Sequence, residues 1–163
     1  MVEAARPADP ADVARIVELA LLLRAELAPM KGGELWLARD AWPPPLDDAY
    51  RVLVERDDAH VVVGTIDDVV LGYGVVVIDT LRSGARLGTV TDLFVELEAR
   101  AVGVGECILD ALLAFCRAHD CIGVDALALP GHRAAKNFFE QHGFTARSLT
   151  MHQPAGERAR PAP

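Results

Sequence analysis

The stretch FVELEARAVGVGECIL, residues 94–109, decides the fold, because it carries a strand into a helix through a turn with two glycines. The first N–H groups of a helix lack intrahelical partners and carry the positive end of the helix dipole, so they can bind an anion. Gly103 and Gly105 would let the main chain approach that anion closely, and Arg100 would add a positive charge. The spacing alone leaves two interpretations open, a phosphate site and a simple strand-to-helix corner.

Two familiar nucleotide-binding motifs do not fit this turn. A Walker loop ends in Gly-Lys-Ser/Thr, whereas Gly105 is followed by Glu106 and Cys107. A dinucleotide fingerprint needs a third small residue where this chain has Ile108, and it needs a parallel βαβ unit where the preceding strands look antiparallel. Neither motif is supported.

Outward from the turn, apolar periodicity and turn residues predict a mixed α+β domain over residues 1–153 and a disordered tail over residues 154–163. The expected strands are 1–6, 60–66, 69–81, 86–96, 122–129 and 144–153, and the second and third form a hairpin across Asp67-Asp68. The expected helices are 10–28, 34–40, 103–119 and 133–142. We find no repeat and no second domain.

Composition narrows the function classes. The 163 residues carry a formal net charge of −8, which argues against nucleic acid and suits small cationic or amine substrates. The three cysteines show no metal-ligand spacing, so no metal site is expected. No window reaches the ~18 apolar residues of a membrane span, and acidic residues interrupt the N-terminus where a signal peptide would be apolar. We expect a cytoplasmic protein with no membrane partner.

Three stretches resemble the GNAT superfamily of acyl-CoA-dependent N-acyltransferases. DLFVELEARAVGVG, residues 92–105, is similar to the family's strand 4 and motif A, whose core Gln/Arg-x-x-Gly-x-Gly/Ala is met by Arg100, Gly103 and Gly105. HRAAKNFFEQHGF, residues 132–144, resembles motif B, and ARPADPADVARIVEL, residues 5–19, resembles the first strand and helix. The resemblance implies a mostly antiparallel sheet of about six to seven strands, with helices on both faces and strands 4 and 5 splayed.

The resemblance also implies acetyl-CoA as co-substrate. The cradle for its pyrophosphate would be Arg100, Ala101, Val102, Gly103, Val104, Gly105 and Glu106. Its pantetheine arm would lie along Phe94, Val95 and Glu96, where a main-chain N–H would face the thioester oxygen as an oxyanion donor. Asn137 and Lys136 in motif B would contact the phosphates of CoA or face solvent.

The implied reaction is direct attack of a neutral amine on the acetyl carbonyl, which needs a base and sometimes an acid. This chain differs from the family at the two positions that usually supply these groups. Thr91 stands where related sequences often have Glu, and Phe139 stands where they have the Tyr that acts as general acid. Asp92 is the nearest candidate base, but strand alternation puts it opposite Thr91, and a structural carboxylate is the alternative. His132, at the Asn position of motif B, is a second candidate, with a helix cap or surface group as its alternative.

Four further side chains have two possible roles. His152 and Tyr73 would border the substrate cleft or be ordinary strand residues. Trp36 and Trp42 would form an apolar wall for the substrate or anchor their irregular segment to the core. The predicted function is acetyl transfer to a primary amine of a small molecule or peptide, by a possible homodimer. The alternatives are a CoA-binding sensor or degenerate domain without transferase activity, and a structural domain that ignores CoA.

Overall fold

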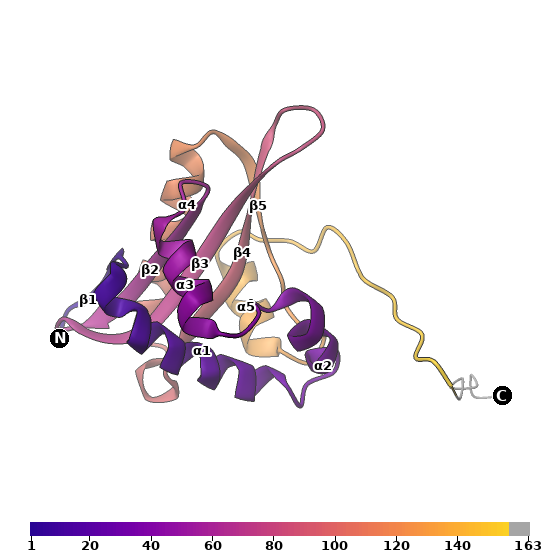
Figure 1. Ribbon diagram of the computed structural model, residues 1–163, viewed down its shortest axis with the longest axis horizontal. Helices are drawn as coiled ribbons and strands as arrows, with labels where there is room; N and C mark the ends of the chain where they lie inside the picture. Colours follow the sequence, from indigo (N-terminus) through magenta and orange to yellow (C-terminus); the bar gives the residue numbers. More distant parts are fainter. Residues whose placement is uncertain (157–163) are drawn as a thin grey trace.

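Five strands form one mixed sheet, in the order β1-β2-β3-β4-β5, in the computed structural model, which describes residues 1–156 (Figure 1). The strands are β1 (Glu3–Pro7), β2 (Ala59–Ile66), β3 (Val69–Thr80), β4 (Arg86–Val95) and β5 (Cys121–Ala126). β1 to β4 pair antiparallel with their neighbours, and β5 pairs parallel with β4. The mixed, mostly antiparallel α+β fold that the sequence predicts is therefore confirmed.

The expected number of six to seven strands is wrong, because residues 144–153 form no strand. Apolar residues of that segment alternate at Phe144 and Ala146 and then slip by one position to Leu149, so no single face could be buried. Leu149 is 82% exposed, and Arg147 instead donates hydrogen bonds to Asp125 at the edge of β5. Of the expected disordered tail, residues 157–163 lie outside the described residues.

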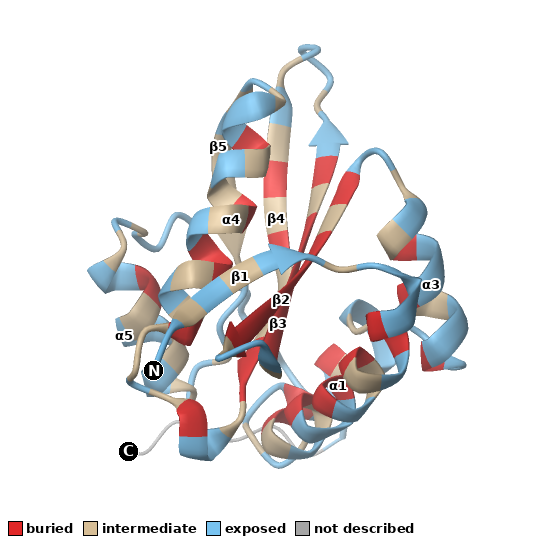
Figure 2. Ribbon diagram, turned by 90° about the vertical axis from the view of Figure 1, so that its left-hand side faces the viewer, coloured by how far each residue is buried: buried red, intermediate tan, exposed pale blue. Residues whose placement is uncertain are grey.

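Helices cover both faces of the sheet, as Figure 2 shows. On one face lie α1 (Val13–Leu27) and α3 (Leu46–Glu55), and on the other lie α4 (Val104–Ala118) and α5 (Arg133–Gln141). The first face contributes Leu19, Leu53 and Val63 to one buried cluster, and the second contributes Ile108 and Leu112 to another. α1, α3 and α4 therefore each bury the apolar stripe that the 3.6-residue period provides.

Short helical turns connect the main elements. Asp9 begins η1 (Pro10–Asp12) with a reciprocal capping box, in which its side chain bonds the N–H of Ala11 and Asp12 bonds the N–H of Asp9. The segment between α1 and α3 contains α2 (Gly33–Leu35) and the π-helix η2 (Trp36–Asp40), and η3 (Leu97–Ala99) follows β4. These turns fix the entry of α1 and the path of the chain around the end of β4.

Two irregularities in β4 shape the centre of the molecule. Pairing with β5 stops at Val90 and Ala126, while β4 continues to Val95, so the last five residues of β4 have no hydrogen-bonded neighbour in β5. Pairing with β3 is interrupted by a β-bulge, because Val76 pairs with Val90 and Val75 pairs with Asp92, leaving Thr91 without a partner. The first irregularity opens a gap in the sheet, and the second turns a side chain beside that gap.

Candidate active site

A cavity of about 470 Å³ fills the gap where β4 extends beyond β5, a volume in the range of small-molecule sites. Its walls come from both faces of the sheet. Leu23, Leu27 and Trp36 line it on the α1 face, whereas Gly105 and Phe138 line it on the face of α4 and α5. The cavity is therefore bounded by residues from both faces of the sheet.

The glycine turn stands at the α4 end of this cavity. Gly103 has φ +97 and is the N-cap of α4, and Ala101 also has positive φ, so the backbone turns sharply before the helix begins. No side chain caps α4, and its first intrahelical bond runs from the N–H of Cys107 to the carbonyl of Gly103. The amides of Val104, Gly105 and Glu106 are thus left without intrahelical acceptors, which is the arrangement that holds an anion.

Arg100 lines the cavity, but its guanidinium is held by the protein. Nη1 and Nη2 donate to the two carboxylate oxygens of Glu26 on α1, at 2.9 and 3.2 Å. Nε donates to the carbonyl of Val95 at 2.8 Å, and the guanidinium lies 5.2 Å from the centre of the Phe94 ring. In this state Arg100 positions the loop after β4 rather than projecting toward the start of α4.

The end of β4 presents one main-chain amide to the cavity. The N–H of Glu96 donates to the carbonyl of Leu71 on β3, and N–H direction alternates along a strand, so the amide of Val95 points toward the gap left by β5. The Val95 carbonyl accepts from Arg100 on that same side. Phe94 and Val95 line the cavity, whereas Glu96 pairs with Arg15 at 2.8 Å and does not line it.

Asp92 is buried on the α1 and α3 face and accepts four hydrogen bonds from uncharged donors. Oδ1 accepts from Trp42 Nε1 at 3.0 Å and from Thr91 Oγ1 at 2.7 Å. Oδ2 accepts from Tyr50 Oη at 2.6 Å and from Tyr73 Oη at 2.7 Å. Among residues 1–156, no cationic side chain forms a salt bridge with this carboxylate, which is only 5% exposed yet borders the cavity.

The predicted alternation of β4 is wrong at Thr91. We expected Thr91 opposite Asp92, with Val90 on the same side as Asp92. Instead Val90 packs in the cluster under α4, and Thr91 bonds both Asp92 and Trp42 Nε1, the latter at 3.2 Å. The bulge adds one residue and so brings Thr91 and Asp92 to the same part of the cavity wall.

Tyr50 and Tyr73 stay protonated and act as hydrogen-bond donors. Burial, followed by the nearby charge of Asp92, raises the pKa of Tyr50 and also raises the pKa of Tyr73. Tyr73 is fully buried and does not line the cavity, so its role is to donate to Asp92 rather than to border a substrate cleft.

Motif B places three side chains on the opposite wall. His132, Asn137 and Phe139 line the cavity, with Phe139 only 8% exposed. Burial lowers the pKa of His132, while Glu26 raises it and Arg100 lowers it. Phe139 has no proton to donate. His132 is thus a half-buried imidazole near the Glu26–Arg100 pair, and no hydrogen bond of the described residues joins it to Asp92.

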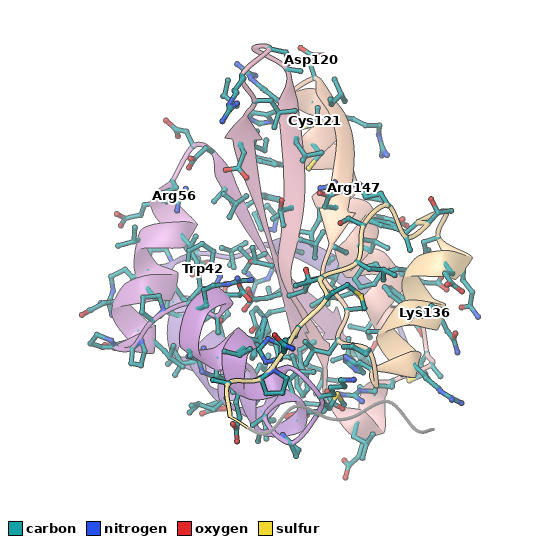
Figure 3. The ribbon with its side chains drawn as sticks, turned by 90° about the vertical axis from the view of Figure 1, so that its right-hand side faces the viewer. Trp42, Arg56, Asp120, Cys121, Lys136 and Arg147 are labelled. Carbon is teal, nitrogen blue, oxygen red and sulfur yellow. The ribbon has the colours of Figure 1, made fainter. Side chains whose placement is uncertain are left out.

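The remaining candidates divide between wall, anchor and surface. Trp36 is buried against the core and lines the cavity, and Trp42 bonds Thr91 and Asp92 from the segment before α3 (Figure 3). Lys136 projects from the outer side of α5 and pairs with Glu140 at 3.1 Å. His152 is exposed in the segment after α5 and does not line the cavity.

Sequence reasoning missed two residues of the site, Glu26 and Tyr50. Tyr50 lies on α3, a helix that we did not predict, although Leu46, Tyr50 and Leu53 have helical spacing directly after Pro45. Glu26 reads as an ordinary surface carboxylate at the end of α1, because nothing in the sequence indicates that Arg100 lies 74 residues away across the cavity.

The sequence matches one family model, and several solved structures share the fold of this chain. Residues 25–144 match the model of the Acetyltransferase (GNAT) family. The tetramutant of the BH1408 protein from Bacillus halodurans superposes with a TM-score of 0.78 at 20% identity, covering 94% of this chain and 99% of that one. A ribosomal-protein-alanine N-acetyltransferase from Brucella melitensis biovar Abortus 2308 gives 0.69 at 15% identity, covering 95% and 100% of the chains.

A glucosamine-6-phosphate N-acetyltransferase from Arabidopsis thaliana gives a TM-score of 0.69 at 18% identity, covering 96% of this chain and 100% of that one. No curated protein matches this chain by sequence. Within residues 1–156, no helix is long and apolar enough to cross a membrane. The same residues include no cluster of three His, Cys, Asp or Glu side chains that could hold a metal ion.

Proposed function

Because the chain belongs to the Acetyltransferase (GNAT) family, we propose that it is an N-acetyltransferase that moves the acetyl group of acetyl-CoA directly to a primary amine of a small molecule or peptide. The observation that carries this proposal is the cavity through the sheet, with the free amides of α4 at one end and Asp92 near the other. Its lining from both faces of the sheet suits a cofactor and an acceptor that meet inside the protein.

The residues present fit acetyl-CoA on the α4 and α5 side. The amides of Val104, Gly105 and Glu106 would hold the pyrophosphate, and the positive φ of Gly103 aims them outward. The start of α4 lies close to Phe138, since a Cβ at Gly105 would be in ordinary van der Waals contact with that ring at 3.4 Å. Asn137 would contact the phosphates from α5. When bound, acetyl-CoA supplies an activated acyl group whose carbonyl oxygen would accept from the N–H of Val95.

The acceptor would bind on the α1 side, against the apolar wall of Leu23, Leu27 and Trp36. The carboxylate of Asp92 has no cationic partner, so it attracts an ammonium group toward the inner end of this wall. We assign Asp92 as the group that finally takes the proton of the ammonium. His132 stays a second candidate on the opposite wall. Because Phe139 cannot donate a proton, CoA would leave as a thiolate without a protein donor. A thiol pKa of about 8.5 makes the thiolate a tolerable leaving group.

Thiol release from acetyl-CoA, measured across a panel of primary amines after CoA binding is confirmed by calorimetry, tests the proposal. We expect binding and amine-dependent release, and replacing Asp92 with Asn should lower kcat by about 10²-fold or more. Phe139 stands where related sequences have the tyrosine that acts as general acid. This difference favours one alternative function, a CoA-binding sensor without transferase activity. That rival predicts tight CoA binding with no turnover on any amine, and absence of any stabilisation by excess acetyl-CoA would remove both ideas. The cytoplasmic location and the homodimer stay predictions.

A further inference from the structure

The carboxylate of Asp92 cannot take a proton from a substrate directly, because all its acceptor positions are used. A carboxylate offers about four lone-pair positions. Trp42 and Thr91 occupy Oδ1, and Tyr50 and Tyr73 occupy Oδ2, all four at 3.0 Å or less. A substrate ammonium that approached Asp92 would therefore have to displace one of these donors.

Thr91 is the one donor of the four that faces the cavity. Trp42, Tyr50 and Tyr73 do not line it, whereas Thr91 does. The hydroxyl of Thr91 donates to Asp92 Oδ1 and accepts at 3.2 Å from Trp42 Nε1, whose single N–H is shared between Thr91 Oγ1 and Asp92 Oδ1. Since a hydroxyl oxygen has two lone pairs, one is left to accept a hydrogen bond from a ligand in the cavity. The β-bulge is what gives Thr91 this orientation.

We propose that Thr91 is a catalytic residue that relays the proton of the acceptor ammonium to Asp92. The step, which rests on the proposed function, is balanced as follows. An N–H bond of the ammonium breaks while an O–H bond forms at Thr91 Oγ1, and the original Oγ1–H proton passes to Asp92 Oδ1. The nitrogen keeps its electron pair for attack on the acetyl carbonyl. The positive ammonium and the negative carboxylate are both neutralised, and after product release the proton returns through Thr91 to water.

The surroundings direct the proton to Asp92 Oδ1. Tyr50 and Tyr73 hold their protons strongly and keep donating to Oδ2, so the incoming proton has only Oδ1 to occupy. Trp42 Nε1 can only donate, which keeps the hydroxyl proton of Thr91 directed at Asp92.

Replacing Thr91 with Val, which removes the hydroxyl and keeps the shape, tests the relay with two acceptors. One is an alkylamine that is protonated at the assay pH, and the other is an amine of low pKa that is already neutral. We expect kcat for the alkylamine to fall by about 10²-fold or more, while kcat for the neutral amine stays within about threefold. Thr91→Ser should restore most of the alkylamine rate.

The matched control is Thr89→Val, the same change two residues earlier on β4 and outside the cavity wall. It should leave both rates and the CoA affinity unchanged. Equal losses on both amines in Thr91→Val, or full activity of that variant on the alkylamine, would overturn the relay while the proposed function stands. If the native protein binds CoA and acetylates no amine, the proposed function fails and the relay fails with it.

Discussion

The backbone of Gly103 connects the cofactor loop to the start of α4. Its φ of +97 lies in the left-handed region, where a side chain costs roughly 1–2 kcal/mol. Steric space is available, because the nearest atom to a Cβ at Gly103 would be 3.8 Å away. The requirement for glycine is thus conformational, and it fixes the direction of the free amides that follow.

Gly103→Ala should lower the free energy of unfolding by about 1–2 kcal/mol and weaken CoA binding, because relaxing the strain would turn the amides away. Chemical denaturation and calorimetry with CoA measure the two effects. Gly131→Ala is the matched control, since a Cβ there meets nothing within 4 Å and its φ is not left-handed. Unchanged stability and unchanged CoA affinity in Gly103→Ala would contradict this account.

For single residues, the sequence predicts which residues belong to the site better than it predicts the orientation of their side chains. Spacing identified Gly103 and Gly105, the family resemblance identified Asp92, and all three residues line the cavity in the structure. The orientation of Thr91 could not be predicted, because a bulge of one residue reverses strand alternation and depends on the partner strand. The ion pair between Arg100 and Glu26 could not be predicted either, because tertiary folding brings together two residues that lie 74 positions apart in the sequence.

At the scale of elements, long periodic segments were predictable and short ones were not. The helix over 103–119 and the hairpin across Asp67-Asp68 match α4 and the β2–β3 turn, where both aspartates have the positive φ of a tight hairpin. α3 was missed because it follows the irregular proline-rich segment. Residues 144–153 were expected to pair with the sheet, and their broken alternation gave them no face to bury.

The packing of α4 on β2 includes a titratable contact outside the cavity. The ring of His60 on β2 stacks on Phe115 of α4, with centroids 4.6 Å apart and an interplanar angle of 2°. Phe115 in turn packs against His119 at 4.1 Å. Burial lowers the pKa of His60 from its ordinary value of 6.5, and the neighbouring His119 lowers it further.

His60→Gln should therefore make stability less dependent on pH. Below about pH 6.5 the unfolded chain binds a proton at His60 that the folded protein resists, so this group lowers the free energy of unfolding as pH falls. Denaturation from pH 7.5 to 5 would show a smaller loss in the variant than in the native protein. His152→Gln, at an exposed position, is the control and should follow the native curve. A parallel loss in His60→Gln would refute the assignment.

At the scale of the whole molecule, the residues that line the cavity bear on whether the acetyl group could first be transferred to the protein. It is lined by residues from both faces of the sheet, and Cys107, Cys116 and Cys121 do not line it. With no thiol in the wall formed by residues 1–156, an acetylated cysteine is not part of the proposed route. Under the proposed direct transfer, both substrates are bound together before the acetyl group moves.

Initial rates should therefore give intersecting lines when acetyl-CoA and the amine are varied together. A covalent enzyme intermediate would instead give the parallel lines of a ping-pong mechanism. Incubation with acetyl-CoA alone, followed by mass measurement of the protein, is an independent check and should show no added acetyl group. Parallel lines or an acetylated enzyme that reacts with amine would exclude direct transfer.

The strand order of the sheet also bears on how the chain folds. β2, β3 and β4 follow one another along the chain and in space, so short loops close these pairs at little entropic cost. β5 can join only after α4 has crossed the sheet, and that parallel pair is short. We expect the antiparallel meander to form early and the β4–β5 contact late. The gap that becomes the binding cavity would then be the last part of the sheet to acquire its final shape.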